Sequence, residues 1–152
     1  MNGIVLYRSR NGATRQYADW IGTALRLPVI DPERVDAQLL AACDFLLIGT
    51  SVYYGELTLR DWLKENVPRL VHKKLFFFIV CAPSPDVSKH GQIIMDNVPG
   101  ALLRPSTDIF FLPGRWLPDN PASKEVSSQD IDAVKKENIA GLLEAVRSLA
   151  HS

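Results

Sequence analysis

The fold is decided by Ile4-Val-Leu-Tyr-Arg-Ser-Arg-Asn-Gly-Ala-Thr14, where a short apolar run meets a small polar turn. The run, Ile4–Tyr7, is typical of a fully buried strand. The turn, Ser9–Thr14, opens a helical pattern. The apolar face of that helix carries Tyr17, Ala18, Ile21 and Leu25. A glycine-containing loop at a helix N-terminus is a ready anion site, because free backbone N–H groups and the positive end of the helix dipole meet there. We therefore expect this loop to hold a phosphate.

The composition is that of a water-soluble chain of ordinary charge. With 152 residues and 47% hydrophobic composition, the chain can form one domain over residues 1–152. Its 17 basic and 17 acidic residues balance, which argues against nucleic-acid and membrane-surface partners. No stretch reads as a signal peptide or a transmembrane segment, and we expect a cytoplasmic protein. Cys43 and Cys81 have no metal or redox spacing, so we expect no metal site, and Cys81 reads as a buried small hydrophobe.

Apolar runs alternate with helical periods along the chain, which is typical of βα units around a parallel sheet. Strands are expected at residues 3–8, 28–31, 44–49, 74–81 and 108–112. Helices are expected at about 14–26, 33–41, 58–67 and 88–98, with a last one that ends near 149. Pro68 is expected to end the third helix, and a capping box at Ser127–Asp130 to begin the last one. The fold class is therefore α/β with five parallel strands.

Open parallel sheets bind ligands beyond the carboxyl ends of the strands, where the strand order reverses. The three loops that leave the middle strands are therefore the candidates for a binding site. They are Ser9–Thr14, Thr50–Glu56 and Ala82–Asp86.

The first loop offers Ser9, Asn11 and Thr14 as side-chain donors, and Gly12 allows a positive φ or a close backbone approach. It has neither the Walker A ending nor the Gly-x-Gly-x-x-Gly pattern. An ordinary polar turn with Thr14 as the N-cap is the alternative. The second loop adds Tyr53 and Tyr54, whose faces suit stacking on a planar ligand, although one ring in the core and one on the surface would also fit.

The first loop, Ser9-Arg-Asn-Gly-Ala-Thr14, resembles the flavodoxin phosphate loop, usually written Ser/Thr-x-Thr-Gly-x-Thr. The second, Gly49-Thr-Ser-Val-Tyr-Tyr-Gly55, resembles the flavin-ring loop of the same family. The pair is most similar to the flavodoxin-domain branch that includes menaquinone-dependent protoporphyrinogen oxidase. The resemblance implies a flavodoxin-like three-layer sandwich. Its five-stranded parallel sheet would have the order 2-1-3-4-5, with helices on both faces.

The resemblance implies FMN as the cofactor. Its phosphate would bind Ser9, Arg10, Asn11, Gly12, Ala13 and Thr14. Its ring would lie against Thr50, Ser51, Val52, Tyr53, Tyr54 and Gly55, with Tyr54 as the stacking residue. The third loop would touch the pyrimidine edge of the ring through Ala82, Pro83 and Ser84. Two features depart from the branch. Asn11 replaces the usual middle threonine, and Gly114–Pro121 is short and not basic where the branch carries a basic, apolar insertion.

Two redox functions from different classes fit these motifs. The first is an FMN-dependent oxidoreductase that exchanges electrons with a quinone-like or other aromatic acceptor, protoporphyrinogen-oxidase-like activity being one form of it. The second is a non-enzymatic carrier that docks on redox partner proteins. The arginines near the first two loops and the absence of an acidic surface favour the enzyme. A domain that has lost its flavin is a third reading. A homo-oligomer is compatible with each.

Overall fold

The computed structural model describes residues 2–10, 12–81, 87–116 and 131–149. Its main sheet has five parallel strands in the order β2-β1-β3-β5-β6. They are β1 (Gly3–Arg8), β2 (Val29–Ile30), β3 (Phe45–Tyr53), β5 (Lys74–Cys81) and β6 (Asp108–Pro113). The additional strand β4 (Glu56–Leu57) pairs antiparallel with β3. The predicted order 2-1-3-4-5 is confirmed, since β5 and β6 are the fourth and fifth strands of the parallel set.

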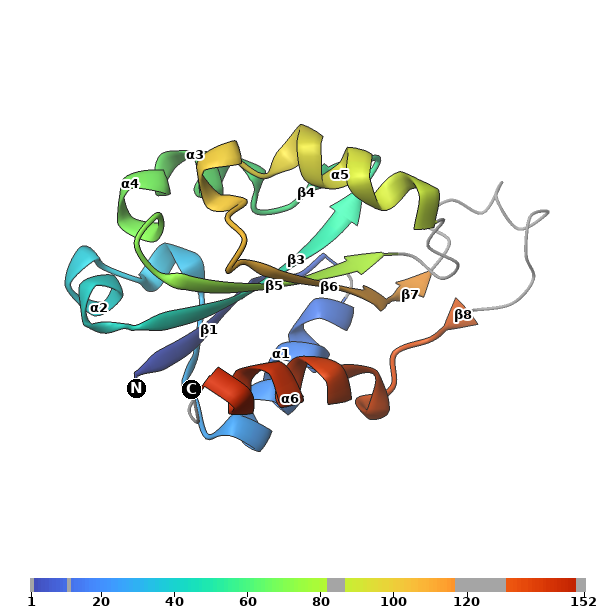
Figure 1. Ribbon diagram of the computed structural model, residues 1–152. Coiled ribbons are helices and arrows are strands. Elements are labelled where there is room, and N and C mark those ends of the chain that lie inside the picture. Colours follow the sequence, from blue (N-terminus) through green and yellow to red (C-terminus); the bar gives the residue numbers. More distant parts are fainter. Residues whose placement is uncertain (1, 11, 82–86, 117–130, 150–152) are drawn as a thin grey trace.

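Helices cover both faces of the sheet, as Figure 1 shows. One face carries α1 (Ala13–Leu25) and α6 (Ala140–Leu149). The other carries α2 (Ala37–Ala42), α3 (Arg60–Glu65), α4 (Val67–Leu70) and α5 (His90–Asn97). The described residues also form four short 3-10 turns, namely η1 (Pro32–Arg34), η2 (Val87–Lys89), η3 (Gly100–Leu102) and η5 (Lys136–Ile139). Beyond the sheet, β7 (Arg115–Trp116) pairs antiparallel with β8 (Ile131–Asp132).

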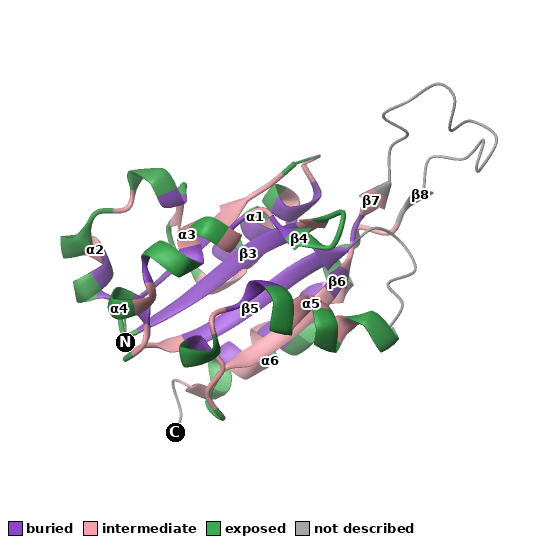
Figure 2. Cartoon of the chain, turned by 90° about the horizontal axis from the view of Figure 1, so that it is seen from above, coloured by how far each residue is buried: buried purple, intermediate pink, exposed green. Residues whose placement is uncertain are grey.

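The core consists of two apolar layers, one on each side of the sheet. Alternation along β5 supplies both, with Phe77 and Ile79 in the layer under α3 and α4 and Phe76 and Phe78 in the layer under α1 and α6. These four side chains are fully buried, and the central strands are the most deeply buried part of Figure 2. Gly49 on β3 leaves space for the ring of Phe78, because a Cβ on residue 49 would overlap that ring. A strand buried on both faces reads as a continuous apolar run, which is why β5 was predictable.

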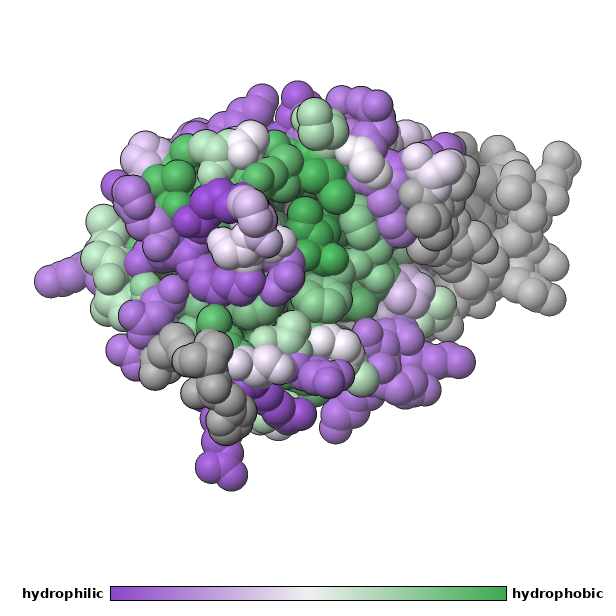
Figure 3. Space-filling view, in the orientation of Figure 1, coloured by the Kyte–Doolittle hydropathy of each residue, from purple (hydrophilic) through white to green (hydrophobic). Residues whose placement is uncertain are grey.

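The outer edge of the sheet is β6, which faces the reader in Figure 3. Hydrophobic residues gather there in a band between the two helical layers, interrupted by a hydrophilic patch. Ile109, Phe110 and Phe111 are half-buried, and the ring of His90 stacks on Phe111 with the ring centroids 3.6 Å apart. Flanking side chains therefore cover much of this edge. No helix in the described part of the chain combines the length and the apolar character needed to cross a membrane.

The helix predicted at 33–41 is wrong, because two separate pieces occupy this region. Asp31 is the N-cap of η1, and its Oδ1 accepts the Glu33 N–H (2.9 Å). Asp36 is the N-cap of α2, and its Oδ1 accepts the Leu39 N–H (2.7 Å). Each aspartate satisfies a free N–H at the start of its own segment, so the chain is extended between them.

Two further helix boundaries differ from the prediction. Pro68 does not end a helix but lies in the first turn of α4, where its missing N–H is not needed. The last helix begins only at Ala140, because β8 and η5 occupy residues that were predicted to be helical. The predicted capping box at Ser127–Asp130 lies outside the described residues.

Candidate functional site

The candidate site lies at the carboxyl edge of the sheet, toward β7 and β8 in Figure 1. Parallel pairing brings its loops together, since Arg8 at the end of β1 is in register with Thr50 of β3, and Thr50 with Ile79 of β5. Strand order reverses here, because the chain runs outward from β1 to β2 and then returns to β3 on the other side. This is the topological switch point at which open α/β sheets bind ligands.

The first loop caps α1 with Gly12, whose φ of 88° lies in the left-handed region that glycine tolerates. The Gly12 N–H donates to Ser9 Oγ (3.0 Å), and the Gly12 carbonyl accepts the Gln16 N–H (3.0 Å). The N-cap is therefore Gly12, and the alternative that Thr14 caps the helix is wrong. No acidic residue occupies the first turn of α1, so nothing there offsets the positive end of the helix dipole.

Thr14 lies in that first turn and is fully buried. Its hydroxyl Oγ1 is itself buried and has no hydrogen-bond partner among the described residues. A buried unsatisfied hydroxyl costs about 1–3 kcal/mol, so a protein rarely retains one without a use. At a helix N-terminus, an anionic oxygen is the partner that the local electrostatics favour.

The second loop is shorter than predicted, because β3 continues through Tyr53 instead of ending at Gly49. Thr50 and Ser51 pair with Ile79 and Val80 and are buried within the sheet. The chain then reverses in a tight turn and returns as β4.

That turn has Tyr54 and Gly55 at its centre, with φ values of 51° and 77°. Two positive φ angles are the requirement of a type I′ hairpin turn, which usually contains asparagine or glycine at its first central position. Tyrosine there lacks the usual sequence signal, and its Cβ makes the left-handed conformation cost about 1–2 kcal/mol. The exposed Tyr54 is thus held in a strained conformation.

The hydroxyl of Thr58 joins the first two loops. Thr58 Oγ1 donates to the Arg8 carbonyl (3.2 Å) and lies 3.0 Å from the Thr50 hydroxyl. Thr50 Oγ1 also accepts the Leu59 N–H (3.1 Å), so its hydrogen-bonding capacity is used within the protein. The ends of β1 and β3 are therefore tied together beneath the candidate site.

Asn97, the last residue of α5, secures the turn from the other side, and sequence reasoning missed it. Its side-chain amide donates to the Gly55 carbonyl (2.9 Å) and the Ile93 carbonyl (2.8 Å), and its Oδ1 accepts the Leu57 N–H (3.1 Å). The residue is only 2% exposed. In the sequence, the only sign of this role is that a polar residue stands between the apolar pair Ile93–Ile94 and Val98. That sign does not identify the partners in the turn, which are about 40 residues away along the chain.

The two tyrosines lie on the surface side of the turn. Their ring centroids are 4.4 Å apart at an angle of 69°, and the Arg10 guanidinium lies 3.3 Å from the centroid of the Tyr53 ring. Tyr54 is 91% exposed, against 37% for Tyr53. Neither ring belongs to the core, so the alternative of one buried tyrosine is wrong, and Tyr54 offers the open aromatic face.

The arginines near the two loops are balanced by carboxylates. Arg8 lies 3.1 Å from Glu33, and Arg60 lies 2.9 Å from Glu56. A weaker contact of 3.9 Å joins Arg15 to Asp19. The positive cluster that the sequence suggested is thus partly neutralised in the fold.

The other predicted contact residues have the following places. Ala13 is the buried first residue of α1, and Val52 is half-buried and packs against the core. Four predicted contacts lie outside the described residues, namely Asn11, Ala82, Pro83 and Ser84. Cys81 is buried as predicted, and burial raises the pKa of its thiol to about 11, so the thiol stays protonated at neutral pH.

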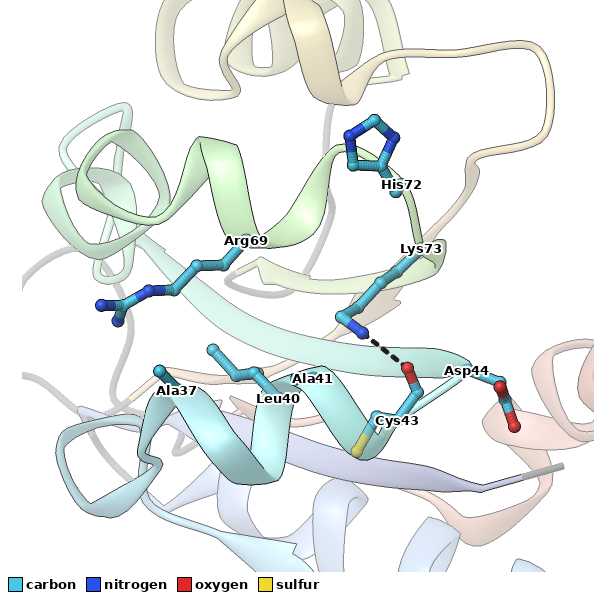
Figure 4. Close-up of a pocket in the computed structure, with 8 residues that line it drawn as sticks. All are labelled: Ala37, Leu40, Ala41, Cys43, Asp44, Arg69, His72 and Lys73. Carbon is cyan, nitrogen blue, oxygen red and sulfur yellow. Dashed lines mark hydrogen bonds between the residues drawn. The ribbon is translucent and has the colours of Figure 1, made fainter.

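A hollow of about 330 Å³ opens beside the first loop, lined by Tyr7, Arg8, Ser9, Gly12, Arg15 and Asp31. Another hollow, of about 320 Å³, lies between α2 and α4 at the opposite edge of the sheet (Figure 4). There the Lys73 ammonium donates to the Cys43 carbonyl (2.6 Å), so it is already engaged within the protein. Of these two hollows, the first adjoins the switch point.

Comparison with known proteins agrees with this geometry. The family model described as flavodoxin domain matches residues 4–119, which is most of the chain. The chain belongs to the flavodoxin domain family. No curated protein matches the sequence significantly.

Solved structures share the fold of this flavodoxin domain at low sequence identity. Oxidised flavodoxin 2 from Bacillus cereus is 19% identical, with a TM-score of 0.59 over 98% of this chain and 99% of that one. The flavodoxin of Streptococcus pneumoniae TIGR4 is 18% identical, with a TM-score of 0.58 over 99% of each chain. The WrbA-like flavodoxin from Agrobacterium tumefaciens is 13% identical, with a TM-score of 0.56 over 99% of each chain.

Proposed function

We propose that this flavodoxin domain binds FMN and exchanges electrons with a small aromatic or quinone-like acceptor. The observation that carries the proposal is the buried hydroxyl of Thr14, which has no partner among the described residues and lies in the first turn of α1. A phosphate monoester would satisfy this hydroxyl and would lie at the positive end of the α1 dipole. Family membership and the resemblance of both loops to flavodoxin motifs support FMN as the source of that phosphate.

The residues present fit each end of such a cofactor. Ser9, Gly12 and Thr14 would hold the phosphate, since they surround the start of α1. The flavin ring would lie against the turn at Tyr54 and Gly55, where the open aromatic face is located. Bound FMN would supply the one- and two-electron redox chemistry, whereas the protein binds, orients and shields it.

Charge around the site supports a small neutral acceptor over a docked partner protein. Carrier proteins use one-signed surfaces to steer partners, whereas the described rim contains charges of both signs in the Arg8–Glu33 and Arg60–Glu56 pairs. The exposed ring of Tyr54 offers stacking to a planar molecule. Porphyrinogen oxidation, which the resemblance implies as one form of this activity, is a reaction to include among the substrates tested.

The test is reconstitution of the purified protein with FMN, followed by absorbance spectra, both midpoint potentials and turnover with quinones and porphyrinogen. We expect a yellow holoprotein that reduces a soluble quinone. A protein that stays colourless after reconstitution contradicts FMN binding. A holoprotein with very low potentials and no turnover of either substrate supports the carrier instead.

Replacing Tyr54 by glycine should stabilise the apoprotein and weaken its binding of FMN. Glycine relieves the left-handed strain, so we expect the free energy of unfolding of the apoprotein to rise by about 0.5–1 kcal/mol. Loss of the ring should raise the Kd for FMN, because the aromatic face is gone. Urea unfolding and a fluorescence titration with FMN measure the two effects. Tyr54→Asn, which also tolerates this conformation, is the matched variant; equal FMN affinity in all three proteins would rule out ring stacking on Tyr54.

A further inference from the structure

Arg115 is the first residue of β7, directly after the chain leaves β6. The junction is anchored twice, since the Gly114 N–H donates to the Cys81 carbonyl (2.5 Å) and the Tyr17 hydroxyl to the Pro113 carbonyl (2.5 Å). A Cβ on Gly114 would lie 2.6 Å from the Cys81 oxygen, so only glycine permits this close approach. The backbone of Arg115 therefore has a defined position relative to β5 and α1.

The Tyr17 hydroxyl, which holds the junction to α1, is itself bonded to η5, the turn that follows β8. Asn138 donates one side-chain N–H group to the Tyr17 hydroxyl (3.0 Å) and another to the Ala133 carbonyl (3.0 Å). The Ala133 N–H in turn donates to the Gly114 carbonyl (3.2 Å). These bonds hold both ends of the β7–β8 segment against the helix that begins at the candidate site.

From that position the Arg115 side chain reaches the first turn of α1. Its Nη2 donates to Gln16 Oε1 (3.1 Å), and its Nη1 lies 3.6 Å from the place that a Cβ on Gly12 would occupy. Residues about 100 positions apart in the sequence thus meet at the loop that caps the helix.

The charge of Arg115 lies at the N-terminus of α1. The 13-residue helix α1 carries the positive end of its dipole at this turn, and no acidic residue in the turn offsets it. An anion beside this turn would be attracted by both the guanidinium and the helix dipole. The buried hydroxyl of Thr14, without a partner among the described residues, is an independent sign of a missing acceptor in the same turn.

We propose that Arg115 is a phosphate-binding residue that makes this site select a phosphorylated flavin over an unphosphorylated one. The inference rests on the proposed FMN function and adds to it a residue outside both flavodoxin loops. The planar guanidinium suits the paired oxygens of a phosphate monoester, and Gln16 Oε1 holds its orientation. Riboflavin has the same ring and no phosphate, so it is the probe that isolates this contribution.

The experiment measures the Kd of FMN and of riboflavin by quenching of flavin fluorescence. Arg115→Met should raise the Kd of FMN by about ten- to a hundredfold, the range for loss of hydrogen bonds to a charged group, and leave that of riboflavin unchanged. Arg115→Lys should lose part of the selectivity, because an ammonium cannot present two parallel N–H groups. Arg147→Met, at an exposed position on α6, is the matched control and should change neither value.

Two readouts separate this role from a structural one. The preference for FMN over riboflavin should fall in Arg115→Met whatever the change in the thermal midpoint of the apoprotein, because a phosphate contact acts on one of the two ligands only. The affinity of the wild type for FMN should fall as KCl rises, and that of the variant should fall less. A lowered apoprotein midpoint with an unchanged preference for FMN would mean that Arg115 only braces the β7–β8 segment.

The outcomes also distinguish this inference from the proposed function. If the wild type binds neither flavin, the FMN proposal fails and takes the role of Arg115 with it. If the wild type binds FMN and Arg115→Met keeps the wild-type ratio of the two Kd values, FMN binding stands and the selectivity role of Arg115 is overturned.

Discussion

Thr14→Val is expected to weaken FMN binding and to stabilise the apoprotein at the same time. Valine has nearly the shape of threonine, so the packing in the first turn of α1 is retained while the hydroxyl is lost. Because Oγ1 is buried with no partner among the described residues, its removal should raise the free energy of unfolding. We expect a gain of about 1 kcal/mol, the lower end of the cost of an unsatisfied buried hydroxyl.

The same change removes the donor that we assign to the phosphate. A hydrogen bond to a charged group contributes about 1.5–3 kcal/mol, so the Kd for FMN should rise by about ten- to a hundredfold. Thr14→Ser keeps the hydroxyl and should bind FMN nearly as well as the wild type. Thr23→Val, on an exposed part of the same helix, controls for the helix propensity of valine.

Urea unfolding of the apoprotein and fluorescence titration with FMN give the two quantities. A loss of stability in Thr14→Val would show that the hydroxyl has a protein partner, and the phosphate assignment would lose its main support. An unchanged Kd for FMN would contradict that assignment directly. The opposite signs of the two expected effects make an accidental agreement with both improbable.

Asn97→Leu is expected to have the largest effect on stability. It leaves the Gly55 carbonyl and the Leu57 N–H without the partner that now satisfies them. Stranding the buried Leu57 N–H costs about 1–3 kcal/mol, and leucine keeps the branched side-chain shape of asparagine, so we expect a loss of about 1–3 kcal/mol. Urea unfolding of the apoprotein measures it.

The loss should be local in origin. Amide hydrogen exchange at Leu57 should accelerate more than exchange at Phe77 in the centre of β5, because the turn is released before the sheet opens. Gln92→Leu, at an exposed position on the same helix, should change the free energy of unfolding by less than about 0.5 kcal/mol. If Asn97→Leu is as stable as that control, Asn97 does not hold the turn.

The sheet and the first loop were predictable from the sequence for a local reason. Strands buried on both faces, such as β5, must be apolar at every position, and a central helix such as α1 must be amphipathic. Periodicity therefore locates them without knowledge of distant partners. The polar turn between β1 and α1 was predictable for the same reason, since a helix N-terminus needs groups that satisfy or cap its free N–H groups.

Boundaries that depend on competing local interactions were harder to predict. A stretch with helical periodicity at 33–41 is divided because Asp31 and Asp36 each cap a separate segment. Pro68 was read as a helix end although it equally suits a helix start, which is where it lies. The length of β3 depended on pairing with β5 and on a turn whose tyrosine carries no hairpin signal.

Periodicity along the sequence was enough to predict an α/β domain with a buried parallel sheet and a polar, glycine-containing loop after its first strand. Only the tertiary structure decided which side chains complete the site. Asn97, Thr58 and Arg115 contact residues that are distant in the sequence, so no periodicity or motif could assign their partners. The same holds for Thr14, because only the packing around its hydroxyl reveals that no described residue is its hydrogen-bond partner.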